Sequence, residues 1–300
     1  MPTRAADLHH FEISGVAFHD TPGGLVRIAI ATPLASAEVY LQGAHITRYQ
    51  PDGAAPVLFL SEKTHLASGK AIRGGVPIIF PWFGARVGHP ESPAHGFART
   101  MEWELESLAS RDNGEIHIVL RLASSAATLA LWPHEFTLRH RITIGEQLHM
   151  ALEVENRGTA PFTFEEALHT YFTVGDVRSA SVTGLENTTY LDKVDAGQRK
   201  HEGAAPIRFT GETDRVYLDT TTVCIVDDPA LARRIAVEKT GSATTVVWNP
   251  WIAKAKAMSD FGDDEWPAML CIETTNAAEN LITLPPNSTH TMTATVRLIS

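Results

Sequence analysis

The amino-acid sequence predicts an all-β protein folded as one large sandwich. Short runs of alternating apolar and polar residues, rich in Val, Ile, Thr and aromatic side chains, recur along all 300 residues. No segment sustains the apolar period of a helix, and no Ser/Gly/Pro linker or shift in composition divides the chain. The long repeat that is typical of propellers is also missing. These observations favour a single domain of packed sheets.

The first predicted strands lie before residue 110. They are GLVRIAIA at 24–31, AEVYLQ at 37–42, VLFL at 57–60 and MEWELESL at 101–108. After the third of them, SEKTH predicts a single helical turn that begins at Ser61, because serine is a preferred N-cap residue.

Two hairpins are predicted in the middle of the chain. The first spans 132–158 and turns at Gly145-Glu146, and the second spans 221–240 with Pro229 near its turn. Strands at 244–251, 269–277 and 290–300 complete the sandwich. The residues expected on the inward faces of the first hairpin and of the strand before it are Ile116, Ile118, Leu120, Leu122, Phe136, Leu138, His140, Ile142, Leu148, Met150, Leu152 and Val154.

Composition excludes several classes of protein. The formal charge of −10 argues against non-specific nucleic-acid binding, which needs a basic surface. No run of about 18 apolar residues predicts a transmembrane helix, and MPTRAADLHHFEISG lacks the apolar core of a signal peptide. Cys224 and Cys271 lie in apolar runs, which predicts buried free thiols in a reducing compartment. We expect a cytoplasmic protein, monomeric rather than oligomeric, with no nucleic-acid or membrane partner.

The segment from Ile72 to Arg99 concentrates unusual residues. It holds Arg73, His95 and Arg99 around an apolar stretch that is interrupted by glycine and proline. Such a segment can anchor itself in the core and still hold charged side chains over a pocket. The alternative is a long loop with solvated arginines and a structural histidine. An acidic protein needs a local group of arginines to bind an anionic substrate, because its overall field repels anions.

Two further polar residues interrupt apolar strands. His169 lies in FEEALHTYF, where it is either a satisfied core residue or a pocket residue that faces a ligand. Glu273 lies in MLCIETTNA, and alternation does not decide whether it faces solvent or the interior. If it is buried, its pKa is raised and it can act as a base near neutral pH.

Asp214 and the tryptophans also have two interpretations. Asp214-Arg215 could form an ion pair in a turn, or Asp214 could accept hydrogen bonds from a polyhydroxylated ligand. The aromatic residues are either core anchors or a wall for a sugar ring; they are Trp82, Phe83, Trp248 and Trp251.

An acid and a base, with neither nucleophile nor metal, suffice to open and close a sugar hemiacetal. One group protonates the ring oxygen and the other removes the proton of the anomeric hydroxyl. Histidine suits the first role and a carboxylate the second. Metal-ligand spacings such as HExxH are absent despite 14 histidines, so we predict no metal site.

Six motifs, in their order along the chain, resemble one known family. IRGGVPIIFPWFG, AHGFAR, EEALHTYF, TDRVY, VVWNPW and MLCIETTNA are similar to motifs of the D-hexose-6-phosphate mutarotases (glucose-6-phosphate 1-epimerases) of the aldose 1-epimerase superfamily. The resemblance extends over residues 20–299 and leaves 1–19 as an N-terminal extension. It implies a galactose-mutarotase-like β-supersandwich as a single catalytic domain, in agreement with the all-β prediction. It also implies that neither a metal nor an organic cofactor is needed, in keeping with the missing ligand spacings.

The resemblance also implies roles for individual residues. His169 matches the general acid at the ring oxygen, and Glu273 matches the base that takes the anomeric proton. The positions that match substrate-binding residues are Arg73, His95, Arg99 and Asp214. The arginines would bind the phosphate of a sugar phosphate substrate, because guanidinium suits bidentate contacts with phosphate. Ala94 departs from relatives that carry glutamine before HGFAR, which weakens the inference about substrate preference.

Two alternative functions stay open at this point. One is a mutarotase of unphosphorylated aldoses, and the other is a non-catalytic carbohydrate-binding protein on the same sandwich. The pair Arg73 and Arg99 favours a phosphorylated substrate, because a neutral sugar gives little reason for two cations in an acidic protein. The presence of both His169 and Glu273 favours an enzyme, since binding alone needs no acid–base pair.

Overall fold

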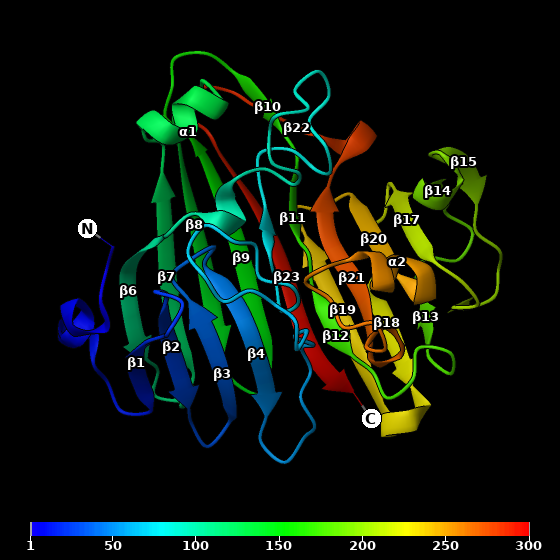
Figure 1. Ribbon diagram of the computed structural model, residues 1–300, viewed down its shortest axis with the longest axis horizontal. Coiled ribbons are helices and arrows are strands. Elements are labelled where there is room, and N and C mark those ends of the chain that lie inside the picture. Colours follow the sequence, from blue (N-terminus) through cyan, green and yellow to red (C-terminus); the bar gives the residue numbers. More distant parts are fainter. Residues whose placement is uncertain (1, 300) are drawn as a thin grey trace.

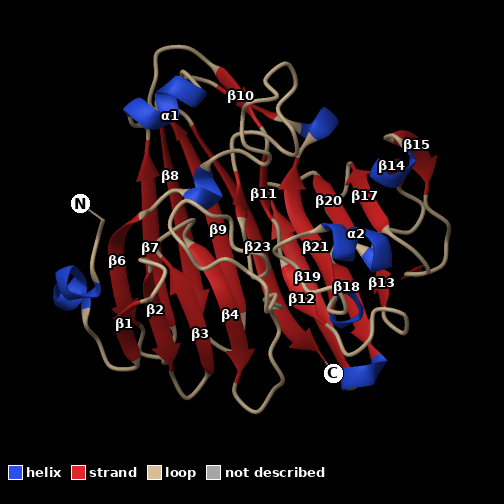
Figure 2. Cartoon of the chain, viewed as in Figure 1, coloured by secondary structure: helices blue, strands red, loops and turns tan. Residues whose placement is uncertain are grey.

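Strands make up most of the regular structure in the computed structural model, which describes residues 2–299. Within this range there are 23 strands and only two α-helices, of six and seven residues. The all-β prediction is therefore confirmed (Figure 2). The sheets share one large hydrophobic core that draws on residues from both ends of the described chain.

A nine-stranded antiparallel sheet forms one layer of the sandwich, in the order β16-β13-β18-β19-β23-β9-β8-β7-β6. Its strands are β6 (Glu104–Ser110), β7 (Ile116–Ala123), β8 (Phe136–Ile144), β9 (Leu148–Asn156), β13 (Ser181–Thr183), β16 (Ile207–Arg208), β18 (Cys224–Asp228), β19 (Arg233–Thr240) and β23 (Thr289–Ile299). The longest strand, β23, lies in the middle of this sheet, between β9 and β19 (Figure 1).

Two sheets form the facing layer. A four-stranded sheet contains β1 (Val16–Asp20), β2 (Val26–Ala31), β3 (Ala35–Tyr40) and β4 (His45–Pro51). An eight-stranded sheet contains β5 (Ile78–Ile79), β11 (Glu166–Leu168), β12 (Tyr171–Thr173), β14 (Thr189–Asp192), β15 (Gln198–His201), β17 (Thr213–Leu218), β20 (Thr244–Asn249) and β21 (Met269–Asn276). The first sheet covers β6 to β9 and the second covers the half with β19 and β18 (Figure 1). Contacts of β3 with β8 and of β21 with β23 join the layers.

The remaining elements are short. A separate two-stranded pair joins β10 (Phe162–Phe164) to β22 (Ile282–Leu284). The α-helices are α1 (Ala126–Leu131) and α2 (Trp251–Ala257). The 3-10 helices are η1 (Ala5–Phe11), of seven residues, and the single turns η2 (Ala98–Thr100), η3 (Lys193–Asp195), η4 (Pro229–Leu231), η5 (Trp266–Ala268) and η6 (Ala278–Asn280).

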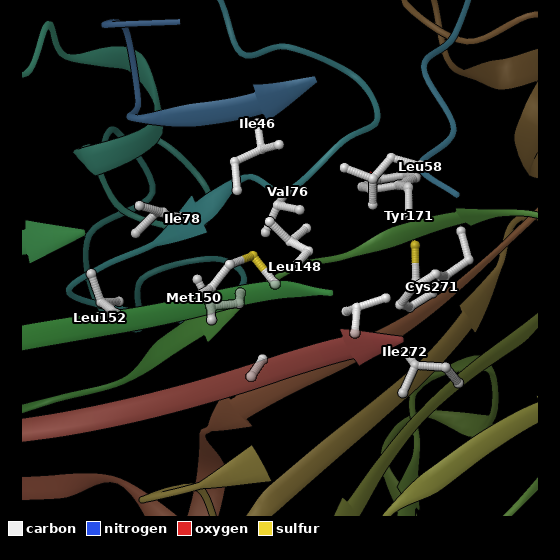
Figure 3. Packing of buried hydrophobic residues seen from close by; sticks show 14 of the residues in the cluster. Ile46, Leu58, Val76, Ile78, Leu148, Met150, Leu152, Tyr171, Cys271 and Ile272 are labelled. Atoms are coloured by element: carbon white, nitrogen blue, oxygen red, sulfur yellow. The ribbon is translucent and has the colours of Figure 1, made fainter. Parts of the chain in front are cut away.

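Both predicted hairpins are confirmed. In β8 and β9, Ile144 pairs with Leu148 across the turn at 145–147, and the predicted inward residues of β7, β8 and β9 are all buried. This face packs against the other layer, and Figure 3 shows Ile46 of β4 and Ile78 of β5 facing the side chains of Leu148 and Met150. The second hairpin joins β18 to β19 through η4.

Two local predictions have a clear outcome. SEKTH is a hydrogen-bonded turn rather than a helix: the Thr64 N–H donates to the Ser61 carbonyl, and no helix continues from it. The Ser61 hydroxyl accepts the Lys63 N–H at 3.2 Å, as an N-cap would, and also donates to Glu265 at 2.6 Å, which ties this turn to a distant loop. Cys224 and Cys271 are buried and free, as predicted.

Candidate active site

One cavity of about 330 Å³ gathers five of the six predicted site residues. Its wall is formed by Arg73, Phe83, Gly84, His95, His169, Tyr171, Lys193, Asp214, Val246, Trp248, Lys254, Met258 and Glu273. These side chains come from the eight-stranded sheet, from the segment around β5, and from η3 and α2. Arg99 is the predicted residue that is not part of the wall.

His169 and Glu273 are brought together by an interruption in strand pairing. Leu168 of β11 pairs with Thr274 and Tyr171 of β12 pairs with Cys271, so the two residues between these short strands lie opposite Ile272 and Glu273 of β21. The distance from His169 Nε2 to Glu273 Oε1 is 3.3 Å. Both side chains are buried, with exposed fractions of 10% for His169 and 1% for Glu273.

Burial acts on this pair in opposite directions. It raises the pKa of the Glu273 carboxyl well above its usual range, and the nearby charge of Asp214 adds to this effect. It lowers the pKa of His169 well below 6.5, and the positive charges of Arg73 and Arg99 act in the same direction. The two groups are therefore suited to share one proton at neutral pH. Within residues 2–299, His169 Nδ1 and Glu273 Oε2 have no hydrogen-bond partner.

Arg73 is held rigidly beside the pair. Its Nη1 donates to the Tyr171 hydroxyl at 3.0 Å, and its Nη2 donates to Asp260 Oδ2 at 3.1 Å. The two glycines of IRGG let the chain pass close to its neighbours: a Cβ on Gly74 would lie 2.4 Å from a carbonyl oxygen, and one on Gly75 would lie 2.2 Å from another. Asp260 was not recognised in the sequence, since it belongs to none of the motifs.

His95 lies at the end of an exposed loop that begins at Gly84, and hydrogen bonds between these two residues close the loop. The backbone N–H of His95 donates to the Gly84 carbonyl at 2.7 Å, and the backbone N–H of Gly84 donates to the ring nitrogen Nδ1 of His95 at 3.2 Å. Because Nδ1 accepts this hydrogen bond, the proton of the neutral ring lies on Nε2. Burial, helped by the charge of Arg99, lowers the pKa of His95 to about 3. The ring therefore remains neutral and can donate to a ligand from Nε2. Its φ of 64° is uncommon for a non-glycine residue.

Arg99 lies on η2 and does not belong to the cavity wall. Its Nη2 donates to the Ala94 carbonyl at 2.9 Å, so the guanidinium helps to fix the segment that carries His95. Its charge is nevertheless close enough to lower the pKa values of His95 and His169.

Asp214 lies in β17, and the interpretation of Asp214-Arg215 as an ion pair in a turn was wrong. Successive residues of a strand point to opposite faces, and Arg215 pairs with Glu202 at 2.8 Å instead. Asp214 faces the cavity, 3.8 Å from Lys254 Nζ, and burial raises its pKa. Sequence reasoning missed two cations of the wall, Lys193 and Lys254, because neither belongs to a motif.

The aromatic residues divide between the two predicted uses. Trp248 and Phe83 belong to the cavity wall. Trp82 and Trp251 are packing residues instead: the Trp82 indole N–H donates to the Pro93 carbonyl, and the Trp251 ring packs on Trp266.

The part of the chain from 2 to 299 contains no cluster of three or more His, Cys, Asp or Glu side chains placed to hold a metal ion. None of its helices has the length and apolar character needed to span a membrane.

Known proteins match this chain over most of its length. The sequence profile described as aldose 1-epimerase matches residues 27–297. A protein of Cenchrus ciliaris named "Putative glucose-6-phosphate 1-epimerase" is 38% identical over 275 residues, which cover 89% of this chain and 82% of the relative. The crystal structure of a Salmonella typhimurium protein, described as a "putative mutarotase (YeaD)", superposes with a TM-score of 0.90 at 33% identity. The superposition covers 96% of this chain and 95% of that one.

A more distant structure supports the fold alone. A "galactose mutarotase related enzyme" from Lactobacillus acidophilus is 13% identical, and it superposes with a TM-score of 0.73 over 91% of this chain and 97% of its own. The expected galactose-mutarotase-like sandwich is therefore confirmed.

Proposed function

The chain belongs to the aldose 1-epimerase family, and on that premise we propose that it interconverts the α and β anomers of D-hexose 6-phosphates, with glucose 6-phosphate as the main substrate. The observation that carries the proposal is the contact of 3.3 Å between His169 and Glu273 in a cavity that also contains Arg73. Relatives at 37–38% identity carry names that specify glucose 6-phosphate.

The proposed reaction consists of two proton transfers and their reversal. His169, protonated on Nε2, gives its proton to the ring oxygen, and the electrons of the bond between C1 and that oxygen move onto the oxygen. Glu273 takes the proton of the anomeric hydroxyl, and C1 becomes an aldehyde. After rotation about the bond between C1 and C2, the ring closes on the other face of the carbonyl. In this closing step the hydroxyl that re-forms the ring returns its proton to His169, and Glu273 returns its proton to the oxygen on C1.

The neighbouring groups supply binding and orientation in this proposal. His95 donates a hydrogen bond from Nε2, because Gly84 occupies its other ring nitrogen. Asp214 accepts hydrogen bonds from sugar hydroxyls, and Trp248 provides an apolar face for the ring. Arg73 binds the phosphate, with Arg99 contributing through its charge.

The proposal is tested by following freshly dissolved α-glucose 6-phosphate to anomeric equilibrium by polarimetry, with and without protein. Glucose and galactose serve as parallel substrates. We expect acceleration that is proportional to protein concentration and greatest for the phosphate ester. Acceleration of the free sugars alone would contradict the role of Arg73, and no acceleration of any of the three would leave a carbohydrate-binding protein as the better explanation.

The variant His169→Asn provides the control for contaminating activity. It removes the proposed acid and keeps a polar side chain of smaller size in the same place. The acceleration by this variant should be lower by about 10²–10⁴-fold, the usual contribution of one general acid.

A further inference from the structure

Arg73, Tyr171, His169 and Glu273 form one continuous row along the cavity wall. The Tyr171 hydroxyl accepts a hydrogen bond from Arg73, and the Tyr171 ring stacks on the ring of His169, with centroids 4.8 Å apart and planes inclined by 8°. His169 in turn contacts Glu273 at 3.3 Å. Burial raises the pKa of Tyr171 to about 12, so the phenol keeps its proton at neutral pH. Tyr171 thus joins a cation to the acid–base pair without itself taking part in the chemistry.

The charged and titratable groups around His169 are unevenly distributed. Those that face it, or act on it from the neighbouring elements, are Arg73 before β5, His95 in the loop that follows β5, Arg99 on η2, Tyr171 on β12 and Glu273 on β21. Apart from the carboxyl of Glu273, none of these groups is acidic at neutral pH. Asp260 Oδ2 accepts from Arg73 Nη2 at 3.1 Å and offsets part of the Arg73 charge. The charge that remains on Arg73, together with that of Arg99, opposes a positive charge on His169, and a further anion on Arg73 reduces this opposition.

Glu273 has different neighbours. The charge that acts on it most is that of Asp214 on β17, and besides His169 the titratable groups near it include the Cys271 thiol and the Tyr171 phenol. A negative charge near Glu273 and positive charges near His169 have the same consequence for a proton that the pair shares. Both hold it on the carboxyl, where His169 cannot donate it to a ring oxygen.

We infer that an anion bound on Arg73 draws the shared proton from Glu273 onto His169, so that the phosphate of the substrate activates the acid–base pair as well as anchoring the sugar. The proton leaves the Glu273 carboxyl and joins His169 Nε2, which gives a carboxylate base and an imidazolium acid with no change in total charge. The inference rests on the proposed function. Tyr171 is a positioning residue in this scheme, because it holds Arg73 and His169 in one rigid row.

The direction of the effect follows from the geometry. The anion neutralises the field of Arg73, which is linked to His169 through Tyr171 and acts on the charge of His169, whereas the charge that acts on Glu273 is that of Asp214. Arg73 also has a buried Nε–H with no hydrogen-bond partner among the described residues, so the guanidinium keeps a donor for an incoming oxygen. Specificity for phosphorylated sugars would then be expressed in turnover, and not in affinity alone.

The test separates the sugar from the anion. D-Xylose provides the ring, because its pyranose is glucose without carbon 6, and phosphite dianion provides the anion. We expect phosphite, at constant ionic strength maintained with sodium chloride, to accelerate the enzymatic mutarotation of α-D-xylose in a saturable manner. The rate should rise by about tenfold for each pKa unit by which phosphite shifts the difference between the pKa values of His169 and Glu273 in favour of His169. The same phosphite series without protein is subtracted, since phosphite catalyses the reaction weakly in solution.

Two variants test the row itself. Tyr171→Phe keeps the stacked ring and removes the hydroxyl that holds Arg73, so the ratio of rates with and without phosphite should fall toward one. Tyr49→Phe is the matched control, because its hydroxyl bonds the Gly145 carbonyl far from the cavity, and its ratio should equal that of the wild type. The ring signals of His169 in nuclear magnetic resonance should also titrate at higher pH when phosphite is present.

The outcomes distinguish the inference from the function on which it rests. If glucose 6-phosphate is converted rapidly and phosphite leaves the xylose rate unchanged, the phosphate only anchors the substrate, and the inference is wrong. An unchanged His169 titration in saturating phosphite would also overturn it. If neither glucose 6-phosphate nor xylose is converted, the proposed function itself fails.

Discussion

Replacing Glu273 by glutamine should lower activity and raise stability at the same time. Glutamine keeps the shape of the side chain but cannot accept the anomeric proton, so kcat/KM for glucose 6-phosphate should fall by about 10²–10⁴-fold. The side chain is 1% exposed, and burial raises the pKa of its carboxyl above the unfolded value. A carboxyl with a raised folded pKa destabilises the native state increasingly as the pH rises above the unfolded pKa of about 4.5. Glutamine removes this cost, so the melting temperature of the variant should exceed that of the wild type at pH 7. This difference in melting temperature should be smaller at pH 4.5.

Polarimetry and thermal unfolding at several pH values check the two halves of this prediction. Glu153→Gln is the matched control, since it removes a carboxylate that pairs with Arg141 at 2.7 Å on the outer face of the nine-stranded sheet. It should leave activity unchanged and alter stability by less than about 1 kcal/mol. Near-wild-type activity of Glu273→Gln would refute the assignment of the base. A loss of stability that grows with pH would refute the argument about burial.

Three further predictions concern other parts of the molecule. Arg73→Ala should reduce turnover of glucose 6-phosphate far more than Arg99→Ala, since only Arg73 lines the cavity, and parallel kcat/KM measurements with both variants check this. His290 contacts the buried carboxylate of Glu166 at 2.9 Å, which raises the pKa of the histidine above 6.5. The stabilising effect of this contact is therefore complete below about pH 6.5 and is lost as the pH rises through the folded pKa of His290. Unfolding measurements on wild type and His290→Gln at several pH values check this. A stability difference between the two that does not change with pH would contradict the ion pair with Glu166. Gly96→Ala should lower the free energy of unfolding by on the order of 3 kcal/mol in denaturant titrations. The reason is that the added Cβ would lie 1.9 Å from a carbonyl oxygen at a residue whose φ is 70°. A decrease below about 1 kcal/mol would show that the loop adjusts.

The alternating pattern was sufficient for the large hairpins because one face of the nine-stranded sheet meets solvent. In β8, Leu138 and Ile142 are buried while Arg141 between them is exposed, so the period of two is visible in the sequence. The same reasoning could not orient Glu273, because every residue of β21 is buried. This strand packs against the core, and Glu273 also lines the cavity, so low exposure alone does not distinguish a core residue from a residue of the cavity wall.

The order of the motifs identified most of the predicted residues that line the cavity. It could not distinguish residues that line the cavity from residues that only hold the lining segments in place. Arg73 and Arg99 look alike in the sequence, but their different positions depend on where the surrounding segments cross. Lys193 and Lys254 lie on short helices with no recognisable pattern, so only the folded chain shows that they reach the cavity. For Asp214-Arg215 the sequence left an ion pair in a turn and a ligand contact open, because only the folded strand shows that the two side chains point to opposite faces.

The central place of β23 has a consequence for how the protein is made. During synthesis, β9 and β19 emerge from the ribosome long before residues 289–299, yet each of them needs β23 as its neighbour. Until that strand arrives, both present an open row of backbone N–H and C=O groups that another chain can pair with. In an incomplete chain, these two edges are therefore the places most open to pairing with another molecule until β23 has been synthesised.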